Sequence, residues 1–266
     1  MLSNVFAKTL YDERRSLVAW VVSVVLLVAL YVAVWPSVRD QPAMSDFLEE
    51  MPEAFRALFA TAGADMSTPV GYIQIELLSF MGPLLVIGYA VAAGGRAIAG
   101  EEERHTLDLV LATSLSRTRL VLEKGAAMAA GVLGLAAVTG VALVLEGSLA
   151  DMGLGAGQVA ATMLHLGLLG LVFGALALAV SGATGHLGAA RAVPAVAAVV
   201  AYLVNGLAPM VDWLEPLQKA SPFYWYVGHD PLRTGVDTGS VLLAVGTSVL
   251  LFAVAAMAFR RRDIAT

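Results

Sequence analysis

Cysteine is absent from the 266-residue sequence, and charged residues are scarce, at 14%. Without cysteine the chain can form no disulfide, has no thiol nucleophile and cannot bind a metal through thiolates. The phosphate-binding pattern G-x-x-x-x-G-K-[ST] is also missing, so the sequence predicts no nucleotide site of that kind. The formal net charge of -5 gives no support to nucleic-acid binding.

Apolar residues are abundant instead, at 59% of the chain, and the mean hydropathy is +0.79. A helix needs about 20 apolar residues to cross a bilayer. Because lipid offers no hydrogen-bond partner to the backbone, each apolar run of that length is expected to be a helix. We therefore predict an all-α membrane protein whose residues 1–266 form one domain with six transmembrane helices. The predicted spans are 17–35, 70–93, 125–145, 159–180, 192–211 and 241–259.

The basic residues predict how the chain is oriented. With six spans, both termini and the loops after spans two and four lie on one side. Most of the 16 lysines and arginines fall in these segments, among them Lys8, Arg104, Lys124, Arg191 and Arg262. Since Lys and Arg concentrate on the cytoplasmic side, we expect both termini to be cytoplasmic.

Amphipathic patterns flank the first span. Apolar residues at helical spacing within residues 2–15, with basic residues beside them, predict an N-terminal helix lying in the inner membrane surface. The alternative is that the first span simply begins early. Residues 36–69 repeat the pattern through Phe47, Met51 and Phe55, which predicts a second amphipathic helix on the outer side.

A further outer segment follows span five and is rich in aromatic residues. Such residues gather at the interface between membrane and water, so this segment is expected to form an aromatic belt. The aromatic residues are Trp213, Phe223, Tyr224, Trp225 and Tyr226.

The densest charge lies in the cytoplasmic segment GEEERHTLDLVLATSLSRTRLVLEK, residues 100–124. Three acids come first, where negative charge stabilises a helix N-terminus. Leu107, Val110 and Leu111 then follow at i, i+3 and i+4, which predicts an apolar stripe on a helix over 101–112. Such a helix suits a groove on a cytoplasmic partner. The alternative is that these charges only terminate two spans. The docking candidates are Glu101, Glu102, Glu103, Arg104, His105, Thr106, Leu107, Asp108, Val110 and Leu111.

The same segment carries a family resemblance. After the three acids come Thr-Leu-Asp-Leu at 106–109, Ala-Thr-Ser at 112–114, a Ser-Arg pair at 116–117 and then Lys124. The end of the chain adds SPF at 221–223 and an Arg-Arg-Asp tail after the last span. These motifs resemble the permeases of ABC type-2 exporters, especially multidrug, bacitracin-type and copper-enzyme-maturation exporters. Ser114 departs from the pattern, which usually has proline there.

The resemblance implies a six-helix permease subunit of the type V exporter fold, with the 101–112 segment as its coupling helix. It also implies two copies of a separate ABC ATPase, which binds ATP and magnesium, and a second permease copy that is identical or related. This chain would then hold no cofactor and no catalytic residue. It would lie in the bacterial inner membrane and move an amphipathic or hydrophobic substrate out of the cytoplasm.

Two polar residues inside apolar runs are candidates for the translocation path, Glu76 in span two and Asn205 in span five. Polar groups within a span tend to turn away from lipid, so both are expected to face the path between two permease copies. The structural alternatives are an acid reaching the outer interface for Glu76 and a bond between helices for Asn205. His165, inside span four, is expected to be a packed, hydrogen-bonded histidine.

Two other classes of function remain open from the residues alone. An intramembrane enzyme would use Ser181 with His186 or His165, but Ser181 and His186 would point about 140° apart on one helix. An ion-coupled secondary carrier is the other alternative. Either would act without an ATPase partner.

Overall fold

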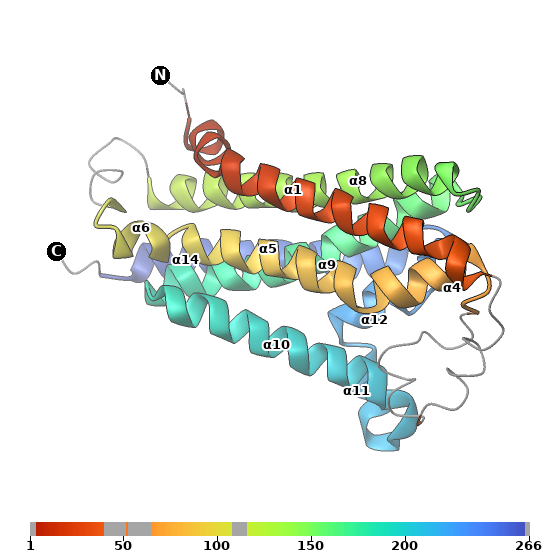
Figure 1. Ribbon diagram of the computed structural model, residues 1–266. Helices are drawn as coiled ribbons and strands as arrows, with labels where there is room; N and C mark the ends of the chain where they lie inside the picture. The colour runs from red at the N-terminus through yellow and green to blue at the C-terminus, as the bar shows by residue number, and fades with distance from the viewer. Residues whose placement is uncertain (1–3, 40–51, 53–64, 108–115, 264–266) are drawn as a thin grey trace.

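The computed structural model describes residues 4–39, 52, 65–107 and 116–263. Over these residues the chain is helical, and six helices are long and apolar enough to cross a membrane (Figure 1). They run over Val5–Val38, Pro69–Arg96, Arg117–Leu149, Ala156–Thr184, Leu187–Met210 and Thr238–Arg261. All six predicted spans are thereby confirmed.

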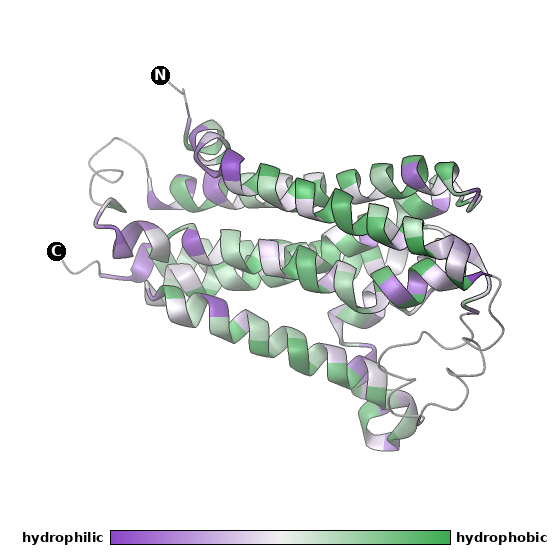
Figure 2. Ribbon diagram, viewed as in Figure 1, coloured by the Kyte–Doolittle hydropathy of each residue, from purple (hydrophilic) through white to green (hydrophobic). Residues whose placement is uncertain are grey.

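The helices form a bundle whose two ends differ. Both chain termini lie at one end, here called the termini end, and the short helices that follow span five lie at the far end (Figure 1). In Figure 2 the middle of the long helices is mainly hydrophobic, and hydrophilic residues gather toward the two ends. This is the distribution expected of helices with an apolar band about as thick as a bilayer.

The long helices are α1 (Val5–Val38), α5 (Gly82–Arg96), α8 (Arg117–Leu149), α9 (Ala156–Thr184), α10 (Leu187–Leu207) and α14 (Thr238–Arg261). Helix α9 is central and mostly buried, whereas only about a fifth of the residues in the apolar spans of α1, α10 and α14 are buried. Glycines let α9 approach its neighbours closely. A Cβ on Gly94 of α5 would lie 2.3 Å from the carbonyl oxygen of Gly174. Close approach through small residues is how helices pack inside membranes.

Helix α1 differs from the prediction of a separate helix over residues 2–15. It is one continuous helix from Val5 to Val38, so no break separates residues 5–15 from the first span. That these first turns lie in the inner membrane surface stays a prediction. In Figure 1 its first turns are seen more nearly end-on than the rest of the helix. Two acceptors hold this N-terminus. The Asn4 side chain accepts the N–H of Ala7, and Glu123 of α8 accepts those of Val5 and Phe6 at 2.7 and 3.2 Å.

The second span is built from three pieces, α4 (Pro69–Ile73), the π-helix η1 (Gln74–Met81) and α5. A π-helical turn is rare and usually occurs at a functional position. It leaves irregular carbonyl groups, and one of them is used: the hydroxyl of Tyr226 donates to the Leu78 carbonyl oxygen at 3.0 Å. The side chain of Gln74 donates to Asp230 at 3.3 Å. The outer segment after span five therefore braces η1.

The segment after span five does not form a simple aromatic belt. It contains η2 (Ala208–Met210), η3 (Asp212–Leu214), α11 (Glu215–Gln218), α12 (Pro222–Val227) and α13 (Pro231–Thr234). Trp213 is exposed, as a belt requires. Phe223 and Tyr226 are buried, however, and the Phe223 ring lies 6.1 Å from that of Phe173 in α9. Helix α12 thus packs into the bundle, because its aromatic side chains fill space beside α9.

The amphipathic helix expected within residues 36–69 lies almost entirely outside the described residues. Helix α1 includes the first part of this range, to Val38, and α4 begins at Pro69. The Thr68 side chain accepts the N–H of Gly71 and caps α4.

Candidate functional site: the α6 segment and the span two to span five region

The short helix α6 (Ala99–Glu103) follows α5 at the termini end (Figure 1). Its N-cap residue, Ile98, has no side chain that can accept a hydrogen bond. The missing acceptor comes from α9: the hydroxyl oxygen of Ser181 accepts the N–H of Ile98 at 3.3 Å and that of Ala99 at 2.8 Å. The same hydroxyl donates to the Gly95 carbonyl oxygen at 2.8 Å. Ser181 therefore caps α6 from a neighbouring helix.

Glu101 connects α6 to α8. Its carboxylate accepts a hydrogen bond from Lys124 at 2.7 Å, and the Lys124 side chain is buried. Thr106 donates to the other carboxylate oxygen. Burial alone would raise the pKa of Glu101, but the hydrogen bonds from Lys124 and Thr106 and the charges of Lys124 and Lys8 together lower it. Glu101 is thus held ionised as the partner of a buried lysine.

Glu102 connects α6 to the end of the chain. Its carboxylate is bound by Arg262, which follows α14. The other nitrogen of that guanidinium reaches the carbonyl oxygens of Ser181 and Gly182 at 3.4 and 3.3 Å. These carbonyls belong to the last turn of α9, where a positive charge is favourable. Glu102 therefore contacts α9 through one arginine.

Leu107 is buried rather than presented to a partner. It is 2% exposed and belongs to a small core with Ile98, Leu120, Leu178 and Phe259. The helix expected over 101–112 is also not continuous, because α6 ends at Glu103 and the chain turns at Arg104 and His105. His105 has a φ of 54°, a left-handed conformation that does not continue a helix.

The other predicted docking residues divide into two groups. Glu103, Arg104 and His105 are exposed, and Thr106 is half-buried. Asp108, Val110 and Leu111 lie outside the described residues. The predicted apolar stripe is therefore wrong for Leu107, while its other two members stay predictions. What the structure exposes beside α6 is a short polar turn.

A polar cavity of about 290 Å³ lies next to α6, between α1, α5 and α8. Its lining carries both signs of charge: Glu13 and Arg96 lie 3.8 Å apart, and Glu101 pairs with Lys124. Asp12 and Arg104 also line it. The first turns of α1 and the start of α6 thus line one cavity with charged side chains.

Glu76 and Asn205 lie on neighbouring segments but do not bind each other. Each is half-buried, and within the described part of the chain no hydrogen bond or ion pair involves either side chain. Phe80, one turn beyond Glu76, packs on Tyr202 of α10 with ring centroids 5.9 Å apart. Glu76 itself is within electrostatic range of Tyr31 and Tyr72. Within the described residues the Asn205 side chain thus forms no bond between helices, whereas the alternative for Glu76, an acid reaching the outer interface, stays a prediction.

The groups that an intramembrane enzyme would need are engaged elsewhere. The Ser181 hydroxyl is occupied by three main-chain groups. The Nδ1 atom of His186 contacts the Thr184 carbonyl oxygen at 2.7 Å. His165 is 3% exposed and bonds to Trp225 and Asp237, as expected of a packed histidine. Ser181 therefore has no histidine partner for nucleophilic catalysis.

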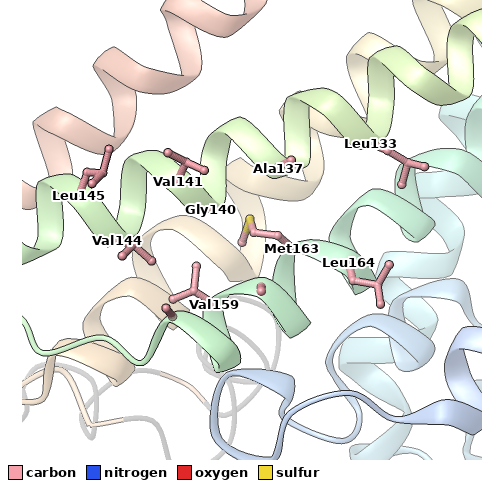
Figure 3. Close-up of a pocket in the computed structure, with 11 residues that line it drawn as sticks. Leu133, Ala137, Gly140, Val141, Val144, Leu145, Val159, Met163 and Leu164 are labelled. Atoms are coloured by element: carbon pink, nitrogen blue, oxygen red, sulfur yellow. The ribbon is translucent and has the colours of Figure 1, made fainter.

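An apolar groove of about 610 Å³ runs between α8 and α9 (Figure 3). In the close-up, Leu133, Ala137 and Val141 follow one another along α8, and Met163 points toward α8 beside Gly140. Gly140 forms part of the floor, because a Cβ there would lie 2.7 Å from Met163. All the residues that line the groove are apolar, so it offers no polar group for recognition.

Sequence reasoning missed three residues that organise this site: Ser181, Lys124 and Arg262. Lys124 and Arg262 contributed only to the orientation and the family resemblance, and Ser181 only to the enzyme alternative. One signal was present for Lys124, since a lysine that begins a transmembrane span needs a partner. Nothing in the sequence distinguishes Arg262 from Arg260 and Arg261, because only the fold brings it to α9.

Comparison with known proteins agrees with a transport role. No curated protein matches the sequence. A family model does match, and it is described as the C-terminal domain of the multidrug efflux system permease Rv1217c. This is consistent with the resemblance to ABC type-2 permeases. Because the match extends over residues 2–260, nearly the whole chain, the protein belongs to this family of multidrug efflux permeases.

Proposed function

We propose that this chain is the membrane-spanning subunit of an ATP-driven exporter, in which a separate ABC ATPase binds ATP and magnesium. The observation that carries this proposal is the arrangement at α6. Glu101 and Glu102 of α6 are bound within the permease, whereas the last residue of α6, Glu103, is exposed together with Arg104 and His105. A partner that binds this exposed turn can move the rest of the permease, because α6 is bound to other helices by ion pairs.

The exposed turn is the proposed docking position. It offers one acid, one base and one histidine. Asp108, Val110 and Leu111 follow it in the sequence and extend the proposed contact. Leu107 leaves the docking set because it fills the permease's own core.

The proposed location is the inner membrane of a bacterium, with the termini end in the cytoplasm. Two observations support this orientation. The termini end carries most of the basic residues, and the positive-inside rule places such an end in the cytoplasm. An ATPase that uses cytoplasmic ATP must also meet α6 at that end.

Two permease copies, identical or related, with two ATPases are the proposed assembly. Glu76 and Asn205 are the proposed lining of its path. This assignment is supported because both side chains are polar and half-buried. They also lie on segments that contact each other through Phe80 and Tyr202. A polar group in a span is stabilised by water or by a polar partner, and a path between two copies supplies either. The proposed cargo is amphipathic or hydrophobic.

The deciding experiment uses inside-out membrane vesicles and ethidium as a fluorescent probe. We expect ethidium accumulation to require ATP and magnesium, and to stop when the phosphate-loop lysine of the co-purifying ATPase is replaced. Accumulation driven by a proton or sodium gradient, with no ATP, would instead support the ion-coupled carrier. Glu103→Lys with Arg104→Glu is expected to weaken ATPase co-purification without changing the amount of folded permease.

A further inference from the structure

Three arginines end the last span, but they lie in different surroundings. Arg260 and Arg261 are exposed, whereas Arg262 is half-buried against α9. Its guanidinium binds Glu102 with one nitrogen and two main-chain carbonyl oxygens of α9 with the other. Arginine suits this position because its planar fork can serve several acceptors at once.

Gly185 makes room for this contact. It ends α9 with a φ of 69°, the left-handed conformation that glycine adopts without strain. A Cβ at this position would lie 2.5 Å from the Glu102 carboxylate and 2.7 Å from the Arg262 guanidinium. The ion pair therefore occupies the space that the missing side chain leaves beside the end of α9.

The tail itself is held in place by a second arginine. Arg117, at the start of α8, donates to the main-chain carbonyl oxygen of Arg262 at 2.7 Å and to that of Phe259 at 3.4 Å. The Phe259 ring lies between them, 5.7 Å from Arg117 and 5.8 Å from Arg262. Both arginines are near enough to this ring for a cation–π interaction. Arg262 is thus fixed at both its main chain and its side chain.

These bonds close a loop between α6 and α9. Ser181 of α9 caps the start of α6 with its hydroxyl, and its carbonyl oxygen accepts from Arg262, which binds Glu102 within α6. We infer that Arg262 is a positioning residue for energy coupling: it clamps α6 to the end of α9, so that a load on α6 passes to the central helix. This inference rests on the proposed function, in which the ATPase loads α6.

The clamp can be measured in the isolated permease. The chain has no cysteine, so Glu103→Cys and Ala183→Cys, both at exposed positions, can carry two nitroxide labels without background. We expect a narrow distribution of distances between the labels. Arg262→Gln should broaden it, and Arg261→Gln, the matched control, should not. An unchanged distribution in Arg262→Gln would overturn the clamp.

The coupling role is measured with the permease and ATPase together, in the ethidium assay. Arg262→Gln should lower the ethidium moved per ATP hydrolysed several-fold, while basal hydrolysis and ATPase co-purification persist. Arg261→Gln should match the parent. Glu102→Gln should have a similar effect to Arg262→Gln, and the double variant little more, because the two residues act as one unit.

Exchanging the charges of Glu102 and Arg262 tests whether the contact with the α9 carbonyls matters in addition to the ion pair. Glu102→Arg with Arg262→Glu keeps opposite charges but sets a carboxylate against the α9 carbonyls, so we expect no recovery. Full recovery would overturn the role of α9 as the receiving helix. If no ATPase co-purifies or ATP drives no transport, the proposed function fails, and the label distances still decide the clamp.

Discussion

The main-chain N–H of Asp237 donates to Nε2 of His165 at 3.2 Å. Because Nε2 accepts, the ring proton of a neutral imidazole must sit on Nδ1, which then donates to the Trp225 carbonyl oxygen at 3.0 Å. One histidine in α9 therefore holds both α12 and the start of α14. The neutral ring satisfies both contacts, and a protonated ring would lose the first of them.

The first prediction concerns this histidine. His165→Ala should remove two part-buried hydrogen bonds, at a cost of about 0.5 to 1.5 kcal/mol for each. We expect a clear drop in the thermal unfolding temperature of the purified permease. His229→Ala is the control, because the His229 side chain is 48% exposed. Equal unfolding temperatures for the two variants would contradict the assigned hydrogen bonds.

The second prediction is that Leu107 stabilises the permease itself. Leu107→Ala should lower the free energy of unfolding by about 2 to 5 kcal/mol, the usual range for a buried leucine. Leu107→Asp should be worse, because a buried charge would lack a partner. Thermal unfolding of the permease without ATPase measures this. Leu149→Ala, at an 87% exposed position, is the control. Normal stability of Leu107→Asp would mean that the side chain points outward.

Leu107 also marks how far the sequence could predict the site. The i, i+3, i+4 pattern marked Leu107 as an apolar contact, but a pattern cannot say which molecule covers a side chain. The answer depends on Leu120, Leu178 and Phe259, which come from three other helices and meet only in the fold. The six spans were predictable for the opposite reason, since the length and composition of each segment suffice in lipid.

The third prediction is the orientation. Thr234 and Ser116 are exposed positions at opposite ends of the bundle. Single cysteines introduced there should differ in their reaction with a thiol reagent in intact cells. Thr234→Cys should react with a membrane-impermeant thiol reagent, and Ser116→Cys should react only after lysis. The parent chain contributes no background because it has no cysteine. Reaction of Ser116→Cys in intact cells would reverse the orientation and remove α6 from the reach of a cytoplasmic ATPase.

The fourth prediction follows from the lowered pKa of Glu101. The pKa of Glu101 is lower in the folded than in the unfolded state. The stabilisation that ionised Glu101 gives the folded permease is therefore fully present above the ordinary pKa of 4.5. It is lost as the pH falls through the lowered folded value. Glu101→Gln should reduce stability at pH 7 by about 1.5 to 3 kcal/mol. The difference from the parent should shrink below pH 4.5, as unfolding curves over pH will measure.

Glu103→Gln provides the matched control for this measurement. Glu103 is exposed, so its substitution should leave the unfolding temperature nearly unchanged at every pH. If Glu101→Gln behaved like Glu103→Gln, the link between Lys124 and Glu101 would contribute nothing to the fold.

The fifth prediction concerns the proposed path. Glu76→Gln and Asn205→Leu should each change ethidium-stimulated ATP hydrolysis while basal hydrolysis and assembly persist. Glu76→Gln keeps the shape and the hydrogen-bonding capacity but removes the charge, so it separates attraction of a cation from packing. Glu146→Gln is the comparison, because Glu146 is an acid of α8, outside the two proposed path segments. Normal transport by both path variants would make Glu76 and Asn205 structural residues.

The partners of the charged residues could not be predicted from the sequence. Glu101 and Lys124 are 23 positions apart, and Glu102 and Arg262 are 160 apart. Spacing along one helix carries no information about such pairs. The sequence did indicate that the charges lie at the ends of the bundle, because charged residues are excluded from the spans.

The π-helix η1 divides the second span into two parts that are held by different neighbours. The inner part, α5, is packed on α9 through Gly94, whereas η1 is tied to the outer segment through Tyr226 and Asp230. The η1 segment that carries Glu76 is therefore held at the end of the bundle away from α6, by residues that follow span five. In the proposed exporter, a cargo or inhibitor that engages the segment after span five would therefore act on the proposed path at Glu76 without moving α6.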